Sequence, residues 1–100
     1  MRIYISGVIS GTTDYLQRFS DAETYLAKQG YIVINPARVL NEMPKDTDHE
    51  EYMILGMAML GMCDSIYMLR GWEKSCGANR EYGYALAKDL KIIFEEGETP

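Results

Sequence analysis

The sequence is poor in the residues that bind most metals. It contains two cysteines, Cys63 and Cys76, and a single histidine, His49. They do not form the closely spaced Cys and His pairs that hold zinc or an iron–sulfur cluster. We therefore expect no metal and no other cofactor. The two thiols are expected to be free, in a reducing, cytoplasmic setting.

Long apolar runs and an excess of positive charge are also missing. No run approaches the roughly 20 residues that cross a bilayer. Met1 leads directly into a strand-like segment, so we expect neither a membrane span nor a signal peptide. Ten Lys and Arg stand against fifteen Asp and Glu, for a net charge of −5. Without a basic stripe, duplex nucleic acid is a disfavoured partner, and a small molecule is the expected ligand.

Short apolar segments alternate with helical patterns along the 100 residues, of which 47% are hydrophobic. This alternation predicts a parallel sheet covered on both faces. Right-handed crossovers favour one α/β domain over 1–100, with three layers and a four-stranded parallel sheet of order 2-1-3-4, flavodoxin-like or Rossmann-like. The predicted strands are 2–6, 31–34, 66–69 and 91–94, and the predicted helices are 15–29, 52–62 and 76–86.

Capping and loop patterns predict the remaining segments. Asp14 begins a capping-box pattern before the first helix, as Thr47 does before the second, and His49 is assigned to the start of that second helix. Gly30 is placed to end the first helix. The connection 37–48 is longer than a usual strand-to-helix loop, so we predict a lid or rim there. A polar tail is expected at 95–100.

Sheets of this kind bind ligands at the carboxyl ends of their strands. We expect three segments to meet there: the loop 6–13, the corner formed by Asn35 and Pro36, and the loop 70–75 with the start of the last helix. The first loop is rich in glycine and hydroxyl groups and resembles an anion cradle. The signal is weak, because the loop lacks the lysine of a P-loop. Its candidate binding residues are Gly7, Ser10 and Gly11.

Glu81 is the main candidate for chemistry. Helical spacing places it on one face with Ala78 and Ala85, and this apolar face is expected to turn toward the sheet. A buried carboxylate costs several kcal/mol unless it is paired or used. Glu81 is therefore a candidate nucleophile or base. The alternative is a surface glutamate paired with a lysine or an arginine.

Other residues near this edge have two interpretations each. Ser75 is a helix N-cap or a phosphate ligand, and the two roles are compatible. Gly77 permits a tight helix start beside it. Trp72 either stacks on a base or plugs the end of the sheet. Cys76 is a reactive thiol at a helix N-terminus or, as we prefer, a buried and inert one.

Two motifs in the chain resemble the nucleoside 2-deoxyribosyltransferase superfamily. The segment 71–81 is similar to the signature of a small phage and bacterial branch of it, and the likeness covers nearly the whole chain. The motifs are Tyr4-Ile-Ser-Gly7 on the first strand and Ser75-x-Gly77-x-x-x-Glu81-x-Gly83-x-Ala85.

This resemblance implies that Glu81 attacks C1′ of a deoxyribosyl group, releases the base and forms a covalent sugar ester, as in retaining glycosidases. It implies that Tyr4 lies near Glu81 and helps to position it. A serine six residues before the nucleophile, here Ser75, resembles the members that act on deoxynucleoside 5′-monophosphates. Members that act on free nucleosides carry an aspartate there. The resemblance also implies a homo-oligomer.

The chain departs from the superfamily at one position. An aspartate on the helix before the third strand handles the leaving base in the superfamily, and Gly56 stands there in this chain. Asp64, eight residues later, is then expected to be structural. The nearby carboxylates that could replace the missing acid are Asp48, Glu50 and Glu51.

The expected function is therefore a nucleoside or nucleotide deoxyribosyltransferase, or an N-glycosidase, acting on a nucleoside 5′-monophosphate. Trp72 and the corner at Asn35 and Pro36 are expected to line the base pocket. Two alternatives stay open. One is a non-catalytic nucleotide-binding or protein-interaction module, which the glycine at position 56 favours. The other is an NAD-type glycohydrolase, which uses the same attack of a glutamate on C1′.

Overall fold

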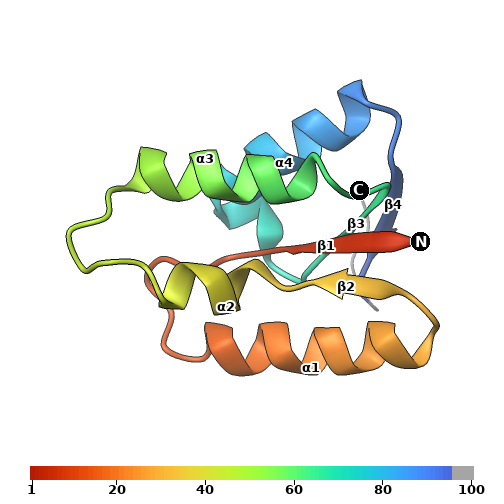
Figure 1. Cartoon of the computed structure of the whole chain (residues 1–100), viewed down its shortest axis with the longest axis horizontal. Coiled ribbons are helices and arrows are strands. Elements are labelled where there is room, and N and C mark those ends of the chain that lie inside the picture. Colours follow the sequence, from red (N-terminus) through yellow and green to blue (C-terminus); the bar gives the residue numbers. More distant parts are fainter. Residues whose placement is uncertain (96–100) are drawn as a thin grey trace.

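A parallel sheet forms the centre of the computed structural model, which describes residues 1–95. Its strands are β1 (Arg2–Ser6), β2 (Ile32–Ile34), β3 (Ser65–Met68) and β4 (Lys91–Phe94). They lie in the order β2-β1-β3-β4, which confirms the predicted order 2-1-3-4 (Figure 1). In this sheet Tyr4 is paired with Ile34 on one side and with Ile66 on the other. The predicted tail at 95–100 lies outside the described residues, except for Glu95.

Helices cover both faces of the sheet, which confirms the three-layer α/β architecture. They are α1 (Tyr15–Lys28), α2 (Pro36–Asn41), α3 (His49–Leu60) and α4 (Cys76–Ala87), with the single turn η1 (Trp72–Lys74) before α4. Figure 1 shows α1 on one side of the sheet and α3 with α4 on the other.

Successive side chains of β1 point to opposite faces of the sheet, because side-chain direction alternates along a strand. Ile3 and Ile5 belong to the cluster that packs on α1. Tyr4 belongs to the cluster beneath α3 and α4. Ser6, two residues after Tyr4, faces the same side and is fully buried. The central strand therefore presents two hydroxyl groups to the layer that contains α3 and α4.

The loop predicted at 37–48 is wrong over its first part, because that part is the short helix α2. Asn35 is its N-cap, and the Asn35 side chain accepts a hydrogen bond from the Ala37 N–H at 3.1 Å. Pro36 occupies the first turn, where proline costs nothing because its missing N–H has no partner in a helix. The Asn-Pro pair thus ends β2 and begins α2 at once.

One capping prediction is shifted by one residue, and another is correct in its position but not in its hydrogen bond. At the start of α3 the capping box is formed by Asp48 and Glu51, one residue after the predicted Thr47 pattern. At the start of α1 the Asp14 side chain makes no cap hydrogen bond, and its carboxylate instead lies 3.6 Å from Arg18 Nε. Gly30, which follows α1, has a φ of +93°, as expected of a helix-ending glycine.

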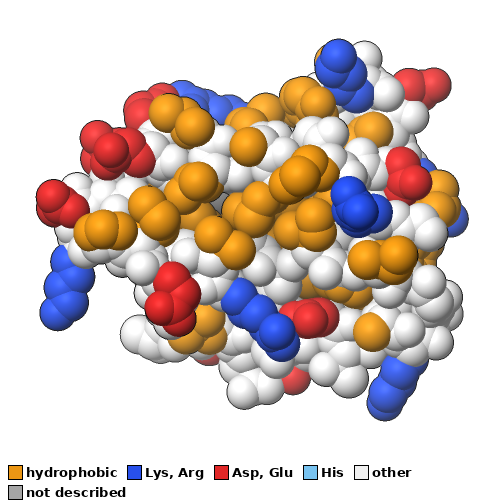
Figure 2. Space-filling model, in the orientation of Figure 1, with side chains coloured by type: hydrophobic (Ala, Val, Ile, Leu, Met, Phe, Trp, Pro, Cys, Tyr) orange, Lys and Arg blue, Asp and Glu red, His pale blue; other side chains and the backbone are white. Residues whose placement is uncertain are grey.

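None of the helices within residues 1–95 is long and apolar enough to cross a membrane. Figure 2 shows hydrophobic side chains gathered across the face that carries α2 and α3. Among the exposed hydrophobic residues of these two helices, Ile54 of α3 is 69% exposed and Val39 of α2 is 44% exposed. Exposed apolar patches of this kind are typical of surfaces that bind a partner.

The first testable consequence concerns Gly7, which follows β1. A Cβ atom at this position would stand 2.9 Å from Leu69 Cβ, which is too close for two carbon atoms. Leu69 is buried in the core and cannot move freely. We expect Gly7→Ala to lower the free energy of unfolding by about 1–3 kcal/mol, the usual cost of overpacking. Urea denaturation measures this change.

The matched control is Gly83, inside α4, where a Cβ atom would meet nothing within 4 Å. Alanine is the better helix former, so Gly83→Ala is expected to be neutral or to stabilise the protein by up to about 1 kcal/mol. Equal stability of the two variants would contradict the assigned contact between Gly7 and Leu69.

Candidate functional site

Glu81 lies on the buried face of α4, as its spacing with Ala78 and Ala85 predicted. The helix begins at Cys76 after the N-cap Ser75, whose Oγ accepts a hydrogen bond from the Ala78 N–H at 3.1 Å. This start places Glu81 in the second turn of the helix, directed at the sheet. Its side chain is only 8% exposed, so the alternative of a surface ion pair is excluded.

Two hydroxyl groups of β1 hold the Glu81 carboxylate. Tyr4 Oη donates to Glu81 Oε2 at 2.6 Å, and Ser6 Oγ donates to Glu81 Oε1 at 2.6 Å. Both distances are short, as expected for a hydroxyl bonded to a carboxylate. Because β1 is an inner strand of the sheet, the two donors are fixed in place. The orientation of the carboxylate is therefore set before any ligand arrives.

Burial and hydrogen bonding act on the Glu81 carboxyl in opposite directions. Burial raises its pKa above the ordinary value because it disfavours the charged form, and the hydrogen bonds from Ser6 and Tyr4 oppose this rise. The pKa of Tyr4 is raised well above its ordinary value, first by burial and then by the charge of Glu81. Tyr4 therefore stays a protonated donor at neutral pH.

A cavity of about 180 Å³ lies beside this carboxylate and opens to the surface. This is smaller than the roughly 300–1,000 Å³ of pockets that enclose a drug-sized ligand. A nucleotide bound here would thus have one part enclosed and the rest at the surface. The walls come from β1 and the loop after it, from α2 and α3, and from the start of α4.

Six of the residues expected at the site line this cavity. They come from two segments that are far apart in the sequence, 4–10 and 75–81, which the fold brings together at the carboxyl ends of the strands. They are Tyr4, Gly7, Ser10, Ser75, Gly77 and Glu81.

Three expected residues do not line the cavity, and each has a structural reason: they are Asn35, Gly11 and, as described below, Trp72. Asn35 caps α2 and donates to Glu23 Oε1 at 3.1 Å, so its amide is already used. Gly11 has a φ of +80°, which fits its place in the turn after β1 rather than a wall of the cavity. The neighbour of Asn35, Pro36, does line the cavity.

Trp72 does not line the base pocket, and the interpretation as an apolar plug applies instead. It is only 5% exposed, with its ring 4.7 Å from the ring of Tyr82 and 6.3 Å from that of Phe94. It belongs to the core beneath α3 and α4. Cys76 is also corrected, because its thiol is exposed and not buried.

The sequence interpretation missed Ser6 and assigned His49 only to the start of a helix. The period-two alternation of β1 could have identified Ser6, since it faces the same side as Tyr4. His49, Met53 and Gly56 are spaced as one face of α3, and all three line the cavity. Aromatic residues from α1 and α3, Tyr15 and Tyr52, complete the wall.

Gly56 is the point at which α3 approaches the carboxylate most closely. A Cβ atom there would stand 2.9 Å from Glu81 Oε2 and 3.0 Å from Tyr4 Oη. A side chain at position 56 would therefore require the end of the Glu81 or Tyr4 side chain to move, which would disturb the hydrogen bond between them. The aspartate that the resemblance led us to expect at this position is absent, and the observed arrangement has no room for it without such a shift.

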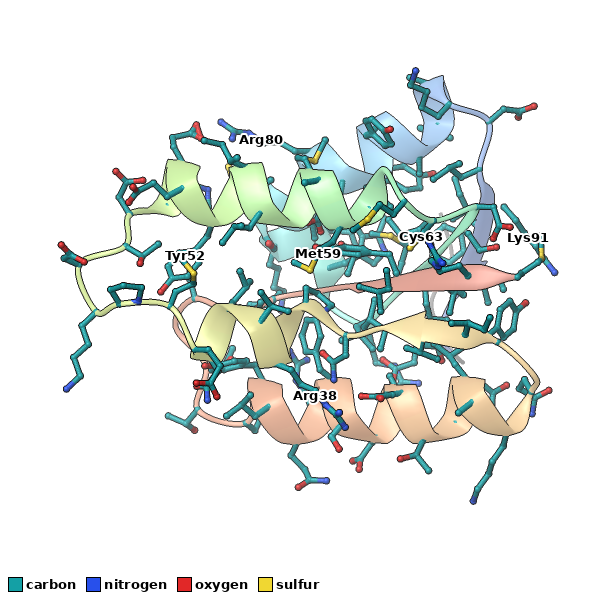
Figure 3. The ribbon with its side chains drawn as sticks, in the orientation of Figure 1. Arg38, Tyr52, Met59, Cys63, Arg80 and Lys91 are labelled. Carbon is teal, nitrogen blue, oxygen red and sulfur yellow. The ribbon has the colours of Figure 1, made fainter. Side chains whose placement is uncertain are left out.

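None of the nearby carboxylates considered as replacements lines the cavity. Asp48 and Glu51 bond each other's backbone in the cap of α3. Glu50 forms an ion pair with Arg80 at 2.8 Å, and Figure 3 shows Arg80 on the side of α3 that faces away from α2. Asp64 is structural, as expected, because its Oδ1 accepts from the Arg2 N–H at 3.0 Å.

Metal ligation has no support in the part of the chain that the structure describes. Within residues 1–95, no three His, Cys, Asp or Glu side chains are grouped closely enough to hold an ion.

One family model matches the chain over residues 1–94, and it is described as a domain of unknown function, DUF4406. The search of curated proteins found no match. The match covers all the strands and helices described above, and with them the residues that line the cavity.

The Glu81 carboxyl gives a stability prediction with a definite sign. Its pKa is raised in the folded protein, so its contribution to stability is fully present below the ordinary value of 4.5 and is lost as pH rises through the raised pKa. Glu81→Gln keeps the shape and does not titrate. As pH rises from the ordinary pKa to the raised pKa, we expect the free energy of unfolding of the variant to increase relative to that of the wild type. The increase should be about 1.4 kcal/mol for each tenfold difference in proton affinity between the folded and the unfolded protein. Urea unfolding at several pH values measures it.

Glu42 provides the matched control, because it is an exposed residue at the end of α2 that does not line the cavity. Glu42→Gln should follow the wild type at every pH. If Glu81→Gln also followed the wild type, burial of a titrating carboxylate would be the wrong description of the site.

Proposed function

The chain belongs to the DUF4406 family, whose description names no activity, and we propose that it cleaves or exchanges the N-glycosidic bond of a deoxynucleoside 5′-monophosphate. The observation that carries this proposal is the carboxylate of Glu81, buried beside an open cavity and held by two hydroxyl donors. Its motifs resemble the nucleoside 2-deoxyribosyltransferase superfamily, and this resemblance supports the same reaction.

In the proposed first step, a Glu81 carboxylate oxygen attacks C1′ of the sugar. The bond from C1′ to the base nitrogen breaks, its electron pair leaves with the base, and an ester forms between sugar and enzyme. In the second step, water or another base attacks C1′ and the carboxylate is released. Two displacements on one carbon give net retention, as in the retaining glycosidases.

Tyr4 and Ser6 act as positioning residues in this scheme. A carboxylate oxygen that accepts one hydrogen bond still has a lone pair for attack. Fixing that oxygen in advance removes orientational freedom that would otherwise oppose the reaction. The same hydrogen bonds favour the ionised form of Glu81, because they oppose the rise in its pKa that burial causes.

The phosphate is proposed to bind where the loop after β1 meets the start of α4. Ser75 accepts from the Ala78 N–H, and its own O–H remains able to donate to a phosphate oxygen. Gly7, Ser10 and Gly77 line the cavity together with Ser75. The positive end of the α4 dipole favours an anion here.

A homo-oligomer is part of the proposal. The exposed apolar side chains on α2 and α3, among them Val39 and Ile54, would be covered by a second copy. Such a contact would involve α2 and α3, two of the helices that contribute residues to the cavity wall. Sedimentation of the purified protein tests this part by itself.

A non-catalytic binding module is the second candidate, and it is favoured by the glycine at position 56, which leaves α3 without an acid there. An NAD-type glycohydrolase is the third, and it would need the same carboxylate. Incubation with deoxynucleotides, ribonucleotides and NAD separates the three, because each predicts a different source of free base or none.

The direct test of the proposal is release of base from deoxynucleoside 5′-monophosphates, followed by chromatography. We expect the wild type to release base, Glu81→Gln to lose at least about 10³-fold in rate as variants without a catalytic carboxylate do, and Glu42→Gln to match the wild type. Intact-mass analysis should show a sugar adduct only when residue 81 is Glu. Nucleotide binding without base release by the wild type would establish the binding module.

The second test uses the dependence of the rate on pH. Glu81 attacks only when ionised, so kcat/KM should rise as pH rises through its raised pKa. Ser6→Ala removes one of the hydrogen bonds that lower this pKa. The rising limb should therefore move to higher pH in the variant.

Ser10→Ala is the matched comparison, because Ser10 lines the cavity as part of the proposed phosphate site. This change should raise KM and leave the rising limb in place. Movement of the limb by both variants, or by neither, would contradict the role given to Ser6.

A further inference from the structure

The proposed reaction needs a proton that Glu81 does not supply. When the bond from C1′ to the base breaks, the electron pair remains on a nitrogen of the base. An acid positioned at the base typically accelerates such a departure by about 10²–10⁴-fold. The structure can be searched for that acid, because the residues that line the cavity are few.

Most of the cavity wall carries no suitable acid. Among the described lining residues, Glu81 is the only carboxylate, and it is the proposed nucleophile. Tyr4 donates to Glu81 and has a pKa raised well above its ordinary value, so it holds its proton tightly. Pro36 and Leu40 of α2 contribute apolar wall. The groups that remain are the phenols of Tyr15 and Tyr52 and the imidazole of His49.

His49 occupies the first turn of α3 on the face that lines the cavity. Met53 and Gly56 follow it on this face at spacings of four and seven residues. Seven residues of α-helix rise by about 10 Å. Gly56 stands over the Glu81 carboxylate, so His49 lies about that far along the helix axis from the point of attack. Met53, between these two residues on the same face, also lines the cavity, so the cavity wall continues from Gly56 to His49.

We propose that His49 is the acid that protonates the departing base, an inference that rests on the proposed function. Imidazole is the side chain whose proton exchange falls nearest to neutral pH, which suits it to this role. The proton donor for the base is thus His49, which lies on the same face of α3 as Gly56, the position that has no side chain.

The proton balance closes within one catalytic cycle. As Glu81 bonds to C1′, the His49 imidazolium gives its proton to a ring nitrogen of the base, and neutral base leaves. The neutral imidazole then takes a proton from the water that attacks C1′. The ester bond breaks, Glu81 recovers its charge, and the imidazolium is restored. The net change is addition of one water molecule across the N-glycosidic bond.

Charged and titratable groups of several elements lie near His49. Asp48 and Glu50 flank it in the sequence at the start of α3, and Glu50 is itself paired with Arg80. Tyr52 follows on the same helix, and Figure 3 shows it on the side of α3 toward α2. From the other elements, Tyr15 of α1 and, deeper, Glu81 of α4 line the same cavity.

The test compares two leaving groups in wild type and His49→Gln. One substrate is a deoxyguanosine 5′-monophosphate, and the other is its N7-methylated form, whose base leaves without gaining a proton. We expect His49→Gln to slow release from the first by about 10²–10⁴-fold and to change release from the second only a few-fold. The falling limb of the wild-type rate at high pH should disappear in the variant.

Three results would count against this inference, and they differ in whether they also reject the proposed function. Equal losses on both substrates would assign His49 to phosphate binding or to structure, and full activity on both would remove it from the reaction. In each of these cases base release by the wild type leaves the proposed function standing. Absence of release from both substrates by the wild type would instead reject the proposed function itself. Glu42→Gln serves as the control and should match the wild type on both substrates.

Discussion

The structure depends on keeping one carboxylate out of water. The effective cost of burying an ion in a protein is several kcal/mol. Two hydrogen bonds to the charged form, at about 1.5–3 kcal/mol each, offset much of this cost but not all of it. The raised pKa of Glu81 agrees with that balance, since burial outweighs the donors Ser6 and Tyr4. Both donors come from β1, and the close approach of Gly56 shields the pair from above. The strand order, the side-chain alternation along β1 and the glycine on α3 thus all contribute to the burial and hydrogen bonding of the Glu81 carboxylate.

Much of this arrangement follows from local patterns. Alternating strands and helices predicted the sheet order, and the spacing of Ala78, Glu81 and Ala85 predicted which side of α4 is buried. Both predictions rest on periodic patterns that are visible in single segments of the sequence, without information on which elements pack against each other. The Asn-Pro corner was harder, because the same two residues can end a strand and begin a helix. Trp72 was ambiguous for a related reason, since a large ring in a polar loop can turn inward or outward.

The parts of the site that could not be predicted depend on distances between elements. Ser6 belongs to the site because β1 runs beneath α4, and the hydrogen bond to Glu81 joins residues 75 positions apart in the chain. Gly56 shows its role only when α3 is placed over the carboxylate, where a Cβ atom would collide with two oxygens. His49 needed the helix face as well, since its first-turn position suggested only a helix start. Sequence spacing orients a side chain within its element but does not fix what lies opposite.

The burial of Glu81 also bears on the choice between an enzyme and a binding module. A module that needed only shape at this position would be served by an apolar or amide side chain, because replacing a buried charge by a neutral group of similar volume is often neutral or stabilising. Keeping a carboxylate costs stability at neutral pH, and proteins commonly accept such a cost where activity requires a strained or charged group. The cavity beside Glu81 gives that charge access to a ligand, and the two hydroxyls of β1 leave each oxygen a lone pair to react. The combination of charge, access and fixed orientation is what a nucleophile requires, and packing alone requires none of the three.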